Sequence, residues 1–455
     1  MPLRRKQLNK LLRRSLLSVL LIAAVLGNAA AAFAAGATAY IVKYKDAPDG
    51  APFGVVSEAE ALRLDRAGLL QWYEPDGEMT LLDGDVSPFY TEDKWDLALI
   101  NAEPAFLMGA LGEGVKVGVL DSGVNPVPAL EGRLLPGRNY VEETATDDTA
   151  DNYGHGTLVA ALIAGQTEDG FLGAAPEAQI VPLKVTDGKM ISVSAVCRAI
   201  YGAVDDYGCG VLNLSLGIYN DSMALREAID HAAEKGVVVV AAVGNSGTRG
   251  KVYPAEYENT VGVGAVDQSG SVYYHSNHNG SVWLTAPGAN VKTAGRLGGY
   301  TTASGTSFSV PLVTAAAAVL LGLDPRLTAD EVASILKDTA QDAGSTGWDE
   351  YYGWGILDLG AAAARLGGAQ IAVPCAFVSD AALVNTADED VECTYYLAEY
   401  DENGVCLGVT ATQLMLPARG RVQIDPPQSA YYGQFVCLTA TGTPLAVARK
   451  SHGNN

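Results

Sequence analysis

Short apolar runs recur through the middle of the chain, separated by stretches with helical spacing. The runs that are rich in β-branched residues cover 115–120, 180–185, 211–216, 237–243 and 260–266. Continuous apolar strands of this kind are typical of a parallel sheet that is buried on both faces. The pattern therefore predicts an α/β domain with helices on both faces of the sheet. In such sheets, active sites collect at the carboxyl ends of the strands.

One longer apolar run predicts a buried helix. Residues 310–321 are Ala-rich, hydrophobic on nearly every side and followed by Gly322. Ser307 would lie at the N-terminus of this helix, beside unpaired backbone N–H groups and the positive end of the dipole. Such a place suits a nucleophile whose reaction creates an oxyanion, although serine is also a favoured N-cap residue.

The first 34 residues have the pattern of an export signal. Six positive charges and no acid precede or flank an apolar run at 16–26, and Ala32-Phe33-Ala34 fits a cleavage site. The apolar run is short for a membrane anchor. We therefore predict a signal peptide over 1–34, membrane contact only during export, and a secreted, extracellular protein.

Composition narrows the function classes. The 455 residues allow two or three domains, and six cysteines in this length do not make a disulfide scaffold. Loss of the six positive charges of the signal peptide would take the net charge from −22 to −28. An exported chain this acidic is a poor candidate for binding nucleic acid or anionic membranes.

Four polar residues stand at predicted strand ends or helix starts: Asp121, His155, Asn245 and Ser307. An acyl-transfer enzyme needs a nucleophile, a base, a group that orients the base, and a donor to the oxyanion. Each residue by itself would more often be a cap, a turn or a structural residue. Their joint appearance at these places favours catalysis.

The stretch from Trp95 to Leu366 resembles the subtilisin-like serine proteases. The resemblance rests on Val119-Leu120-Asp121-Ser122-Gly123, Gly154-His155-Gly156-Thr157, Asn213-Leu214-Ser215-Leu216-Gly217, Gly305-Thr306-Ser307 and Pro311. The order Asp, His, Ser is that of the family. The resemblance implies that Ser307 attacks a peptide carbonyl, His155 transfers the proton and Asp121 orients the imidazole. It also implies that Asn245 and the Ser307 N–H bind the oxyanion.

The resemblance further implies a substrate cleft. Ser215, Leu216 and Gly217 would form an edge that pairs with an extended peptide. The primary specificity pocket would have walls at Ser215 to Gly217 and at Ala242 to Gly244, and a floor at Val252, where the family commonly has glycine. A one-residue slip in the alignment would place Lys251 there instead. With valine as the floor, we expect small or medium apolar side chains to be preferred over Phe and Tyr.

The chain departs from the family pattern around the family's common calcium site. Leu130 stands where an aspartate ligand is common, and the stretch from 165 to 173 is short, so that site is expected to be absent. Asp147, Asp148 and Asp151 could still hold a cation, but a solvated acidic loop is the preferred interpretation. Structural calcium stays possible, and no cofactor is expected to be required.

The predicted organisation has four parts. A signal peptide over 1–34 is followed by an α+β segment over 35–90 and a catalytic domain over 91–366. The segment has a predicted strand at 39–45 and helical spacing at 57–70, and Tyr40-Ile41-Val42 resembles the first strand of the family's propeptides. We expect it to act as an intramolecular inhibitor of a zymogen, with an ordinary N-terminal subdomain as the alternative.

Residues 367–455 are predicted to form a small β-sandwich-like domain. Short strand-like runs lie between 371 and 440, and Asn403-Gly404 is a strong hairpin signal. Four cysteines here allow three disulfide pairings. Cys197 and Cys209, by contrast, are expected to be buried thiols of the catalytic domain.

The main hypothesis is a secreted serine endopeptidase with polypeptide substrates. A catalytically degenerate relative that binds or regulates is the rival from another class. A processing protease with one physiological substrate is a third possibility.

Overall fold

The computed structural model describes residues 39–45, 53–82, 86–87, 94–141, 146–167, 170–188 and 190–367, together with the strands between 375 and 451. The predicted signal peptide, with the charges at its start and its cleavage site, lies outside the described residues. The chain forms two compact units, and the first of them holds both the small N-terminal α+β segment and the large central sheet.

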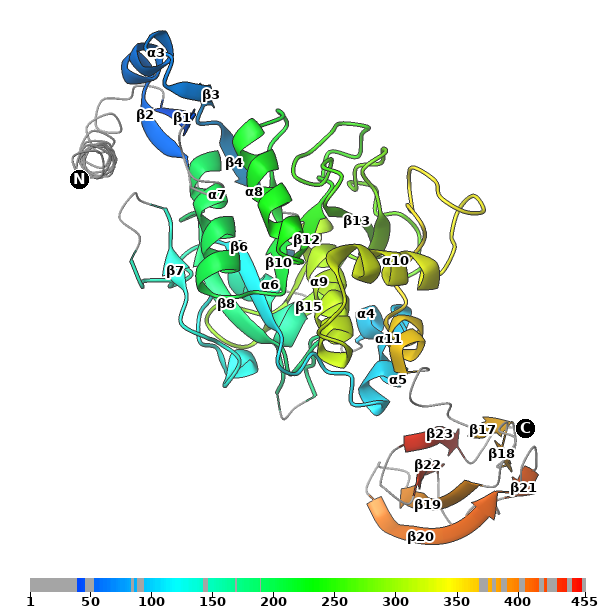
Figure 1. Ribbon diagram of the computed structural model, residues 1–455. Coiled ribbons are helices and arrows are strands. Elements are labelled where there is room, and N and C mark those ends of the chain that lie inside the picture. The colour runs from blue at the N-terminus through cyan, green and yellow to red at the C-terminus, as the bar shows by residue number, and fades with distance from the viewer. Residues whose placement is uncertain are drawn as a thin grey trace, which may run out of the picture. The chain divides into compact units, whose positions relative to one another are not determined.

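A seven-stranded parallel sheet forms the centre of the catalytic domain, in the order β14-β13-β12-β10-β6-β8-β7 (Figure 1). Its members are β6 (Lys116–Asp121), β7 (Arg138–Asn139), β8 (Gln179–Lys184), β10 (Val211–Leu214), β12 (Val238–Ala242), β13 (Val261–Val266) and β14 (Leu284–Pro287). The five predicted strands are confirmed to within two residues. The sequence pattern did not indicate β7 and β14, which are short and lie at the two edges.

Helices cover both faces of this sheet. Helices α7 (Val193–Tyr201) and α8 (Met223–Glu234) lie side by side, and their apolar side chains share one core with Leu212 and Leu214 of β10 (Figure 1). Asn213, between those two leucines, bonds Thr314 of α9 (Thr306–Leu323) instead. Successive strand residues point to opposite faces, so α9 covers the other face. Helix α6 (His155–Ala164) packs beside α9.

Helix α9 begins four residues before the predicted apolar run and carries Ser307 in its first turn. Its side chains are buried from Thr306 to Leu321, which confirms the predicted buried helix. Within the part of the chain that the structure describes, α9 alone is long and apolar enough to cross a membrane. Its burial in the domain explains that composition without a membrane.

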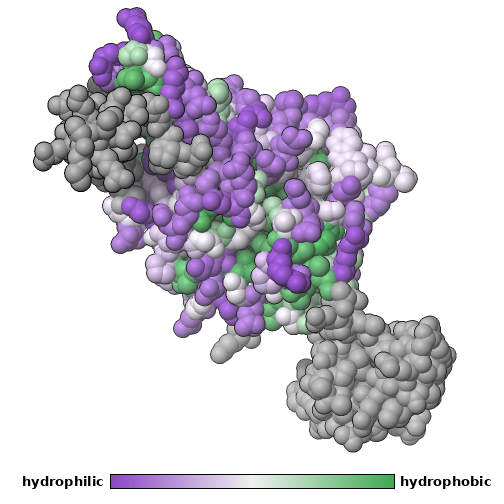
Figure 2. All heavy atoms as spheres, in the orientation of Figure 1, coloured by the Kyte–Doolittle hydropathy of each residue, from purple (hydrophilic) through white to green (hydrophobic). Residues whose placement is uncertain are grey.

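Several shorter elements lie outside the large sheet. They are α4 (Trp95–Leu99), α5 (Ala102–Leu107), β9 (Ile191–Ser192), β11 (Leu216–Gly217), β15 (Val291–Ala294), β16 (Tyr300–Ala303), α10 (Ala329–Thr339) and α11 (Leu359–Gly367). A capping box formed by Thr328 and Glu331 starts α10. Figure 2 shows mostly hydrophilic residues over the visible face of the unit that holds the large sheet, as expected of an acidic chain.

The predicted α+β unit before the catalytic domain is present. Strands β2 (Gly54–Ser57), β1 (Ala39–Tyr44) and β3 (Leu70–Pro75) form an antiparallel sheet in that order. Helix α3 (Glu58–Arg66) starts at the N-cap Ser57 and contributes Ala61 and Leu64 to a small core. The chain then continues into β4 (Glu78–Leu81), which joins the catalytic domain.

The C-terminal unit contains two antiparallel sheets. Their orders are β17-β18-β21 and β20-β19-β22-β23. The strands are β17 (Cys375–Val378), β18 (Ala382–Asn385), β19 (Val391–Tyr400), β20 (Cys406–Leu416), β21 (Arg421–Gln423), β22 (Tyr432–Thr439) and β23 (Pro444–Ser451). Pairing of β19 with β20 agrees with a hairpin at Asn403-Gly404, a turn that lies outside the described residues. The sandwich arrangement and the disulfides stay predictions.

Candidate active site

Asp121 and His155 meet at the carboxyl end of the central strand β6. The imidazole Nδ1 lies 2.9 Å and 2.8 Å from the two carboxylate oxygens, and both side chains are buried. Burial raises the pKa of the Asp121 carboxyl, while His155 and the Ser122 N–H act to lower it. Because the carboxylate accepts from Nδ1, the neutral imidazole keeps its lone pair on Nε2. The geometry therefore prepares His155 to act as a base.

Two glycines allow His155 to start its helix this close to Asp121. Gly154, the residue before α6, has a φ of 113°, which side chains rarely tolerate. At Gly156, a Cβ would collide with the Gly123 carbonyl oxygen and lie 3.0 Å from the Asp121 Cβ. The Gly-His-Gly pattern in the sequence thus has a steric cause: the helix N-terminus presses against the loop after β6.

Asp151 joins the aspartate loop to the histidine helix. Its carboxylate accepts from the Ser122 hydroxyl at 2.8 Å, from the Gly154 N–H at 2.6 Å, and from the N–H and hydroxyl of Thr157 at 2.9 Å and 2.6 Å. The Ser122 hydroxyl in turn accepts from the Gly156 N–H. Asp151 is 1% exposed, so the expectation of a solvated loop is wrong for this residue. Its oxygens are used by donors at the start of a helix, where a negative charge is favoured.

Ser307 lies in the first turn of α9, next to β10. Its hydroxyl donates to the carbonyl oxygens of Leu82, at 2.5 Å, and Ser215, at 3.2 Å. The residue after it, Phe308, packs its ring 5.4 Å from the imidazole of His155, centroid to centroid. Serine and histidine are thereby brought to one place from two helices on the same face of the sheet. The hydroxyl points at a carbonyl group and does not cap α9, which answers the N-cap alternative.

Asn245 approaches the same carbonyl from the end of β12. Its Nδ2 donates to the Leu82 oxygen at 2.5 Å. Its Oδ1 accepts from the N–H and the hydroxyl of Thr306, at 2.8 Å and 2.9 Å. A backbone N–H can only donate, so Thr306 fixes which end of the amide faces Leu82. The side chain of Asn245 is therefore oriented as a donor to a carbonyl oxygen placed beside Ser307.

The chain itself occupies the cleft between these residues. Strand β4 pairs antiparallel with β11, with Leu81 opposite Leu216 and Thr80 opposite Gly217, and the Leu82 N–H donates to the Ser215 oxygen. On its other side β4 pairs with β9. The predicted edge at 215–217 thus binds an extended peptide. The opposite edge, Ile191–Ser192, was missed because a two-residue strand directly before a helix leaves no distinct pattern.

Val252, the predicted floor of the specificity pocket, lies near Gly217, as Leu82 does. A Cβ placed on Gly217 would collide with Cγ1 of Val252 and lie 3.3 Å from Cδ1 of Leu82, and one on Gly244 would lie 2.8 Å from Cγ2 of Val252. Val252 is 1% exposed, whereas Lys251 is largely exposed and pairs with Glu256. The structure thus brings Val252, and not Lys251, close to Gly217 and Gly244. Ala242 is buried at the end of β12.

The free cysteines and the acidic residues of the catalytic domain are further candidates for reactive or metal-binding groups. Cys197 and Cys209 are buried free thiols, as predicted, and burial raises the pKa of Cys209 to about 12. Among the described residues, no group of three or more His, Cys, Asp and Glu is arranged to hold a metal ion. The possibility of structural calcium stays a prediction.

Comparison with known proteins agrees with this geometry. The model of the subtilase family matches residues 112–355. An alkaline protease from Alkalihalobacillus alcalophilus is 36% identical over 307 residues, which cover 67% of this chain and 76% of the relative. Subtilisin BL and subtilisin Savinase, both from Lederbergia lenta, are 36% and 37% identical over 59% of this chain and 97% of each relative.

Proposed function

This chain belongs to the subtilase family and is a serine endopeptidase, and on that premise we propose that Asp121, His155, Ser307 and Asn245 carry its chemistry. The observation that supports this assignment most strongly lies at one atom. The Ser307 hydroxyl and the Asn245 amide both donate to the carbonyl oxygen of Leu82, in a chain that lies extended through the cleft.

The reaction follows from these positions. The Ser307 oxygen attacks the carbonyl carbon of the substrate while Nε2 of His155 takes the hydroxyl proton. The Asp121 carboxylate stabilises the imidazolium through Nδ1 and stays unprotonated. Protonated His155 then gives the proton to the leaving amine as the C–N bond breaks, which leaves an ester on Ser307. Water, deprotonated by the same imidazole, hydrolyses that ester.

The negative charge on the carbonyl oxygen in these steps falls where Asn245 already donates. The Ser307 N–H, in the first turn of α9, is proposed as the second donor, with the helix dipole favouring negative charge there. Thr306 holds the amide of Asn245 before the reaction begins. Preorganised donors of this kind stabilise the transition state because they need no reorientation during the reaction.

We further propose that the segment before Asp83 is an inhibitory prosegment and that the protein is a zymogen. It contacts the catalytic domain well beyond the cleft. Glu74 accepts from the Ser222 hydroxyl and from the N–H groups of Met223 and Ala224, at the start of α8. Asp76 accepts from the N–H and hydroxyl of Ser194, at the start of α7. Carboxylates at two helix N-termini give the segment affinity that a passing substrate lacks.

The position of Leu82 supports a self-cleavage point between Leu82 and Asp83. That point lies inside the predicted 35–90 segment and sharpens its end. The Ser307→Ala precursor should accumulate uncut when it is expressed in a protease-free preparation, while the wild-type precursor yields a mature chain that begins at Asp83. Mass spectrometry of both proteins tests this, and trimming of the Ser307→Ala precursor at the same bond would contradict self-processing.

The pocket around Leu82 supports the predicted preference for small or medium apolar side chains. Val252 fills space between Gly217 and Gly244 that a larger aromatic ring would need. We expect Val252→Gly to raise kcat/KM for Phe relative to Leu by roughly 10- to 200-fold at most, the range that small misfits in an apolar pocket produce. Matched Ala, Leu and Phe substrates measure this, and a wild-type preference for Phe that the substitution leaves unchanged would remove the idea.

The proposed physiological setting is outside the cell. The predicted signal peptide supports secretion, and polypeptides are the substrates. Catalysis by this set of residues needs no cofactor. What the C-terminal unit binds, and whether one substrate or many are cut, is left to a peptide-library profile of the mature enzyme.

The assignment is tested by Ser307→Ala together with a serine-directed fluorophosphonate. The wild-type mature enzyme should hydrolyse peptides and become labelled at Ser307, and the variant should do neither. Ser309→Ala is the matched control, because it removes a buried hydroxyl two residues further along α9, and this variant should keep both properties. Absence of hydrolysis and labelling in the folded wild-type enzyme would favour the degenerate, regulatory alternative.

A further inference from the structure

The chain remains bound to the catalytic domain after the carbonyl of Leu82. Strand β5 (Val86–Ser87) pairs antiparallel with β16, with Val86 opposite Ala303 and Ser87 opposite Thr302. On its other side β16 pairs with β15, so the three strands form one small sheet. Counted from the proposed cut bond, Val86 and Ser87 are the fourth and fifth residues on the leaving side.

We propose that the outer edge of β16 binds the leaving side of polypeptide substrates by strand addition, out to the fifth residue after the cut bond. This inference rests on the proposed function, because it takes Leu82 as the residue before that bond. The ligand is an extended peptide of unrestricted sequence, since paired backbone groups recognise main chain and not side chains.

The position of β16 in the fold fits this role. The strand ends at Ala303, four residues before Ser307, so its edge is connected directly to the nucleophile. Its inner edge is already used by β15, with Thr302 opposite Lys292 and Ala303 opposite Val291. Without a strand beside it, the outer edge would present unpaired N–H and C=O groups, which readily take up another chain.

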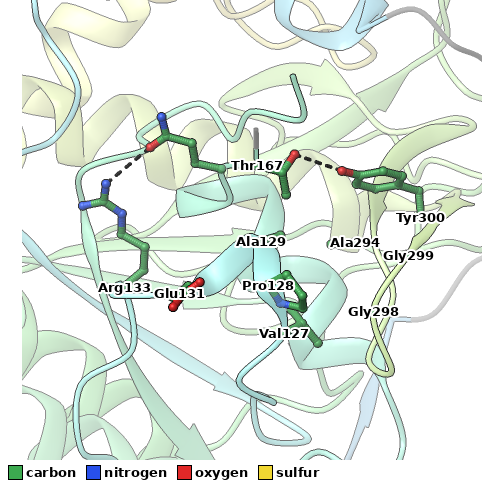
Figure 3. Close-up of a pocket in the computed structure, with 11 residues that line it drawn as sticks. Val127, Pro128, Ala129, Glu131, Arg133, Thr167, Ala294, Gly298, Gly299 and Tyr300 are labelled. Carbon is green, nitrogen blue, oxygen red and sulfur yellow. Dashed lines mark hydrogen bonds between the residues drawn. The ribbon is translucent and has the colours of Figure 1, made fainter. Parts of the chain in front are cut away.

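The far end of this edge opens into free space. Tyr300, the first residue of β16, lines a pocket of about 720 Å³ together with Gly298, Gly299 and residues of the 127–133 segment. Figure 3 shows the Tyr300 hydroxyl bonded to Thr167 at the rim of this pocket, at 2.9 Å. A strand that runs antiparallel to β16 from Ala303 leads toward Tyr300. We therefore expect a longer substrate to continue from the fifth residue toward this pocket.

The test uses mature enzyme obtained from the full chain and fluorescence-quenched peptides that differ only after the cut bond. Leaving sides of two, three, five and seven residues are compared. We expect kcat/KM to rise between three and five residues by roughly 2- to 10-fold for each backbone hydrogen bond gained. A value that is constant from three residues onward would overturn the proposal.

N-methylated peptides separate strand pairing from general contact. In an antiparallel pair, opposite residues alternate between exchanging two hydrogen bonds and exchanging none. Methylation of one of the two amides, at the fourth or the fifth residue, should therefore abolish the gain, while methylation of the other should leave it. Equal effects at both positions would overturn strand pairing.

The shortest peptide separates this proposal from the proposed function. If the wild-type enzyme cuts it and the Ser307→Ala variant does not, the chemistry stands whatever the length series shows. If the folded wild-type enzyme cuts no peptide, the proposed function fails first. A normal rate on the shortest peptide with no length dependence overturns only the binding edge on β16.

Discussion

Two aspartate–histidine pairs within the described residues have similar distances and very different surroundings. Asp121 and His155 lie 2.8 Å apart with side chains 0% and 3% exposed. Asp205 and His231 lie 3.0 Å apart with side chains 44% and 11% exposed. The first pair bonds through Nδ1 at the start of a buried helix. The second pair bonds through Nε2 of His231, which lies in the last turn of α8 and packs its ring on Tyr201.

The difference shows why a pair of residues is not yet a site. Charges in a buried pair interact with little screening, whereas an exposed pair contributes about 0–1 kcal/mol. In the buried pair, Asp121 holds Nδ1 and leaves Nε2 for proton transfer. In the exposed pair, the carboxylate occupies Nε2 itself. The ring of His155 also packs against Phe308, next to Ser307, which together with Asn245 donates to the Leu82 carbonyl. His231 lies at the surface end of α8.

The largest effect should separate the two aspartates. Asp121→Asn keeps the shape of the side chain but favours the wrong imidazole tautomer, so kcat should fall by about 10⁴-fold. Asp205→Asn, the matched change in the exposed pair, should leave kcat within about twofold, because that pair lies on the surface and contributes little. Steady-state kinetics on one peptide measures both. Comparable losses in the two variants would contradict the distinction.

The next effect concerns Asn245, the proposed hydrogen-bond donor to the oxyanion. Asn245→Ala should fold and lose about 10²–10³ in kcat, because one hydrogen bond to the developing oxyanion disappears. KM should change much less, since the interaction strengthens only in the transition state. Thr306→Val should cause a smaller loss, because the backbone N–H still holds the amide. A larger loss from Thr306→Val than from Asn245→Ala would argue against the proposed order of roles.

Asp151 tests how far the buried pair depends on its supports. Asp151→Asn replaces a carboxylate that accepts four hydrogen bonds, so unfolding free energy should fall by about 2–3 kcal/mol. Its negative charge also raises the pKa of the Asp121 carboxyl, so removing it should lower that pKa and move the acid limb of kcat/KM to lower pH. Asp148→Asn, an exposed acid nearby, is the control and should move neither quantity. An acid limb that stays in place would reduce Asp151 to a structural role.

The smallest effect belongs to His231, the histidine of the outer pair. His231→Gln should change the free energy of unfolding by less than about 1 kcal/mol, since its partner is nearly half exposed. Chemical denaturation measures the change, and peptide hydrolysis should continue at the wild-type rate. A loss of activity in the folded variant would mean that the outer pair reaches the site through α8.

The sequence by itself determined the parts of this protein whose signals are local. Apolar runs gave the five central strands, and the Ala-rich run gave the buried helix behind Ser307. The proposed catalytic residues Asp121, His155, Asn245 and Ser307 were also chosen from the sequence, since each follows a strand or starts a helix within a short, specific motif. The small α+β unit before them was predicted from the same kind of pattern.

Only the tertiary structure decided which distant residues meet. The carbonyl of Leu82 reaches Ser307 across 225 positions of the sequence, and no periodicity or propensity encodes such a contact. The same holds for Asp151, where a loop position rich in acids predicts solvent exposure. Its burial arises because donors from the aspartate loop and the histidine helix converge on it. Local patterns report how a segment folds, whereas burial and partners depend on what the remaining chain packs against it.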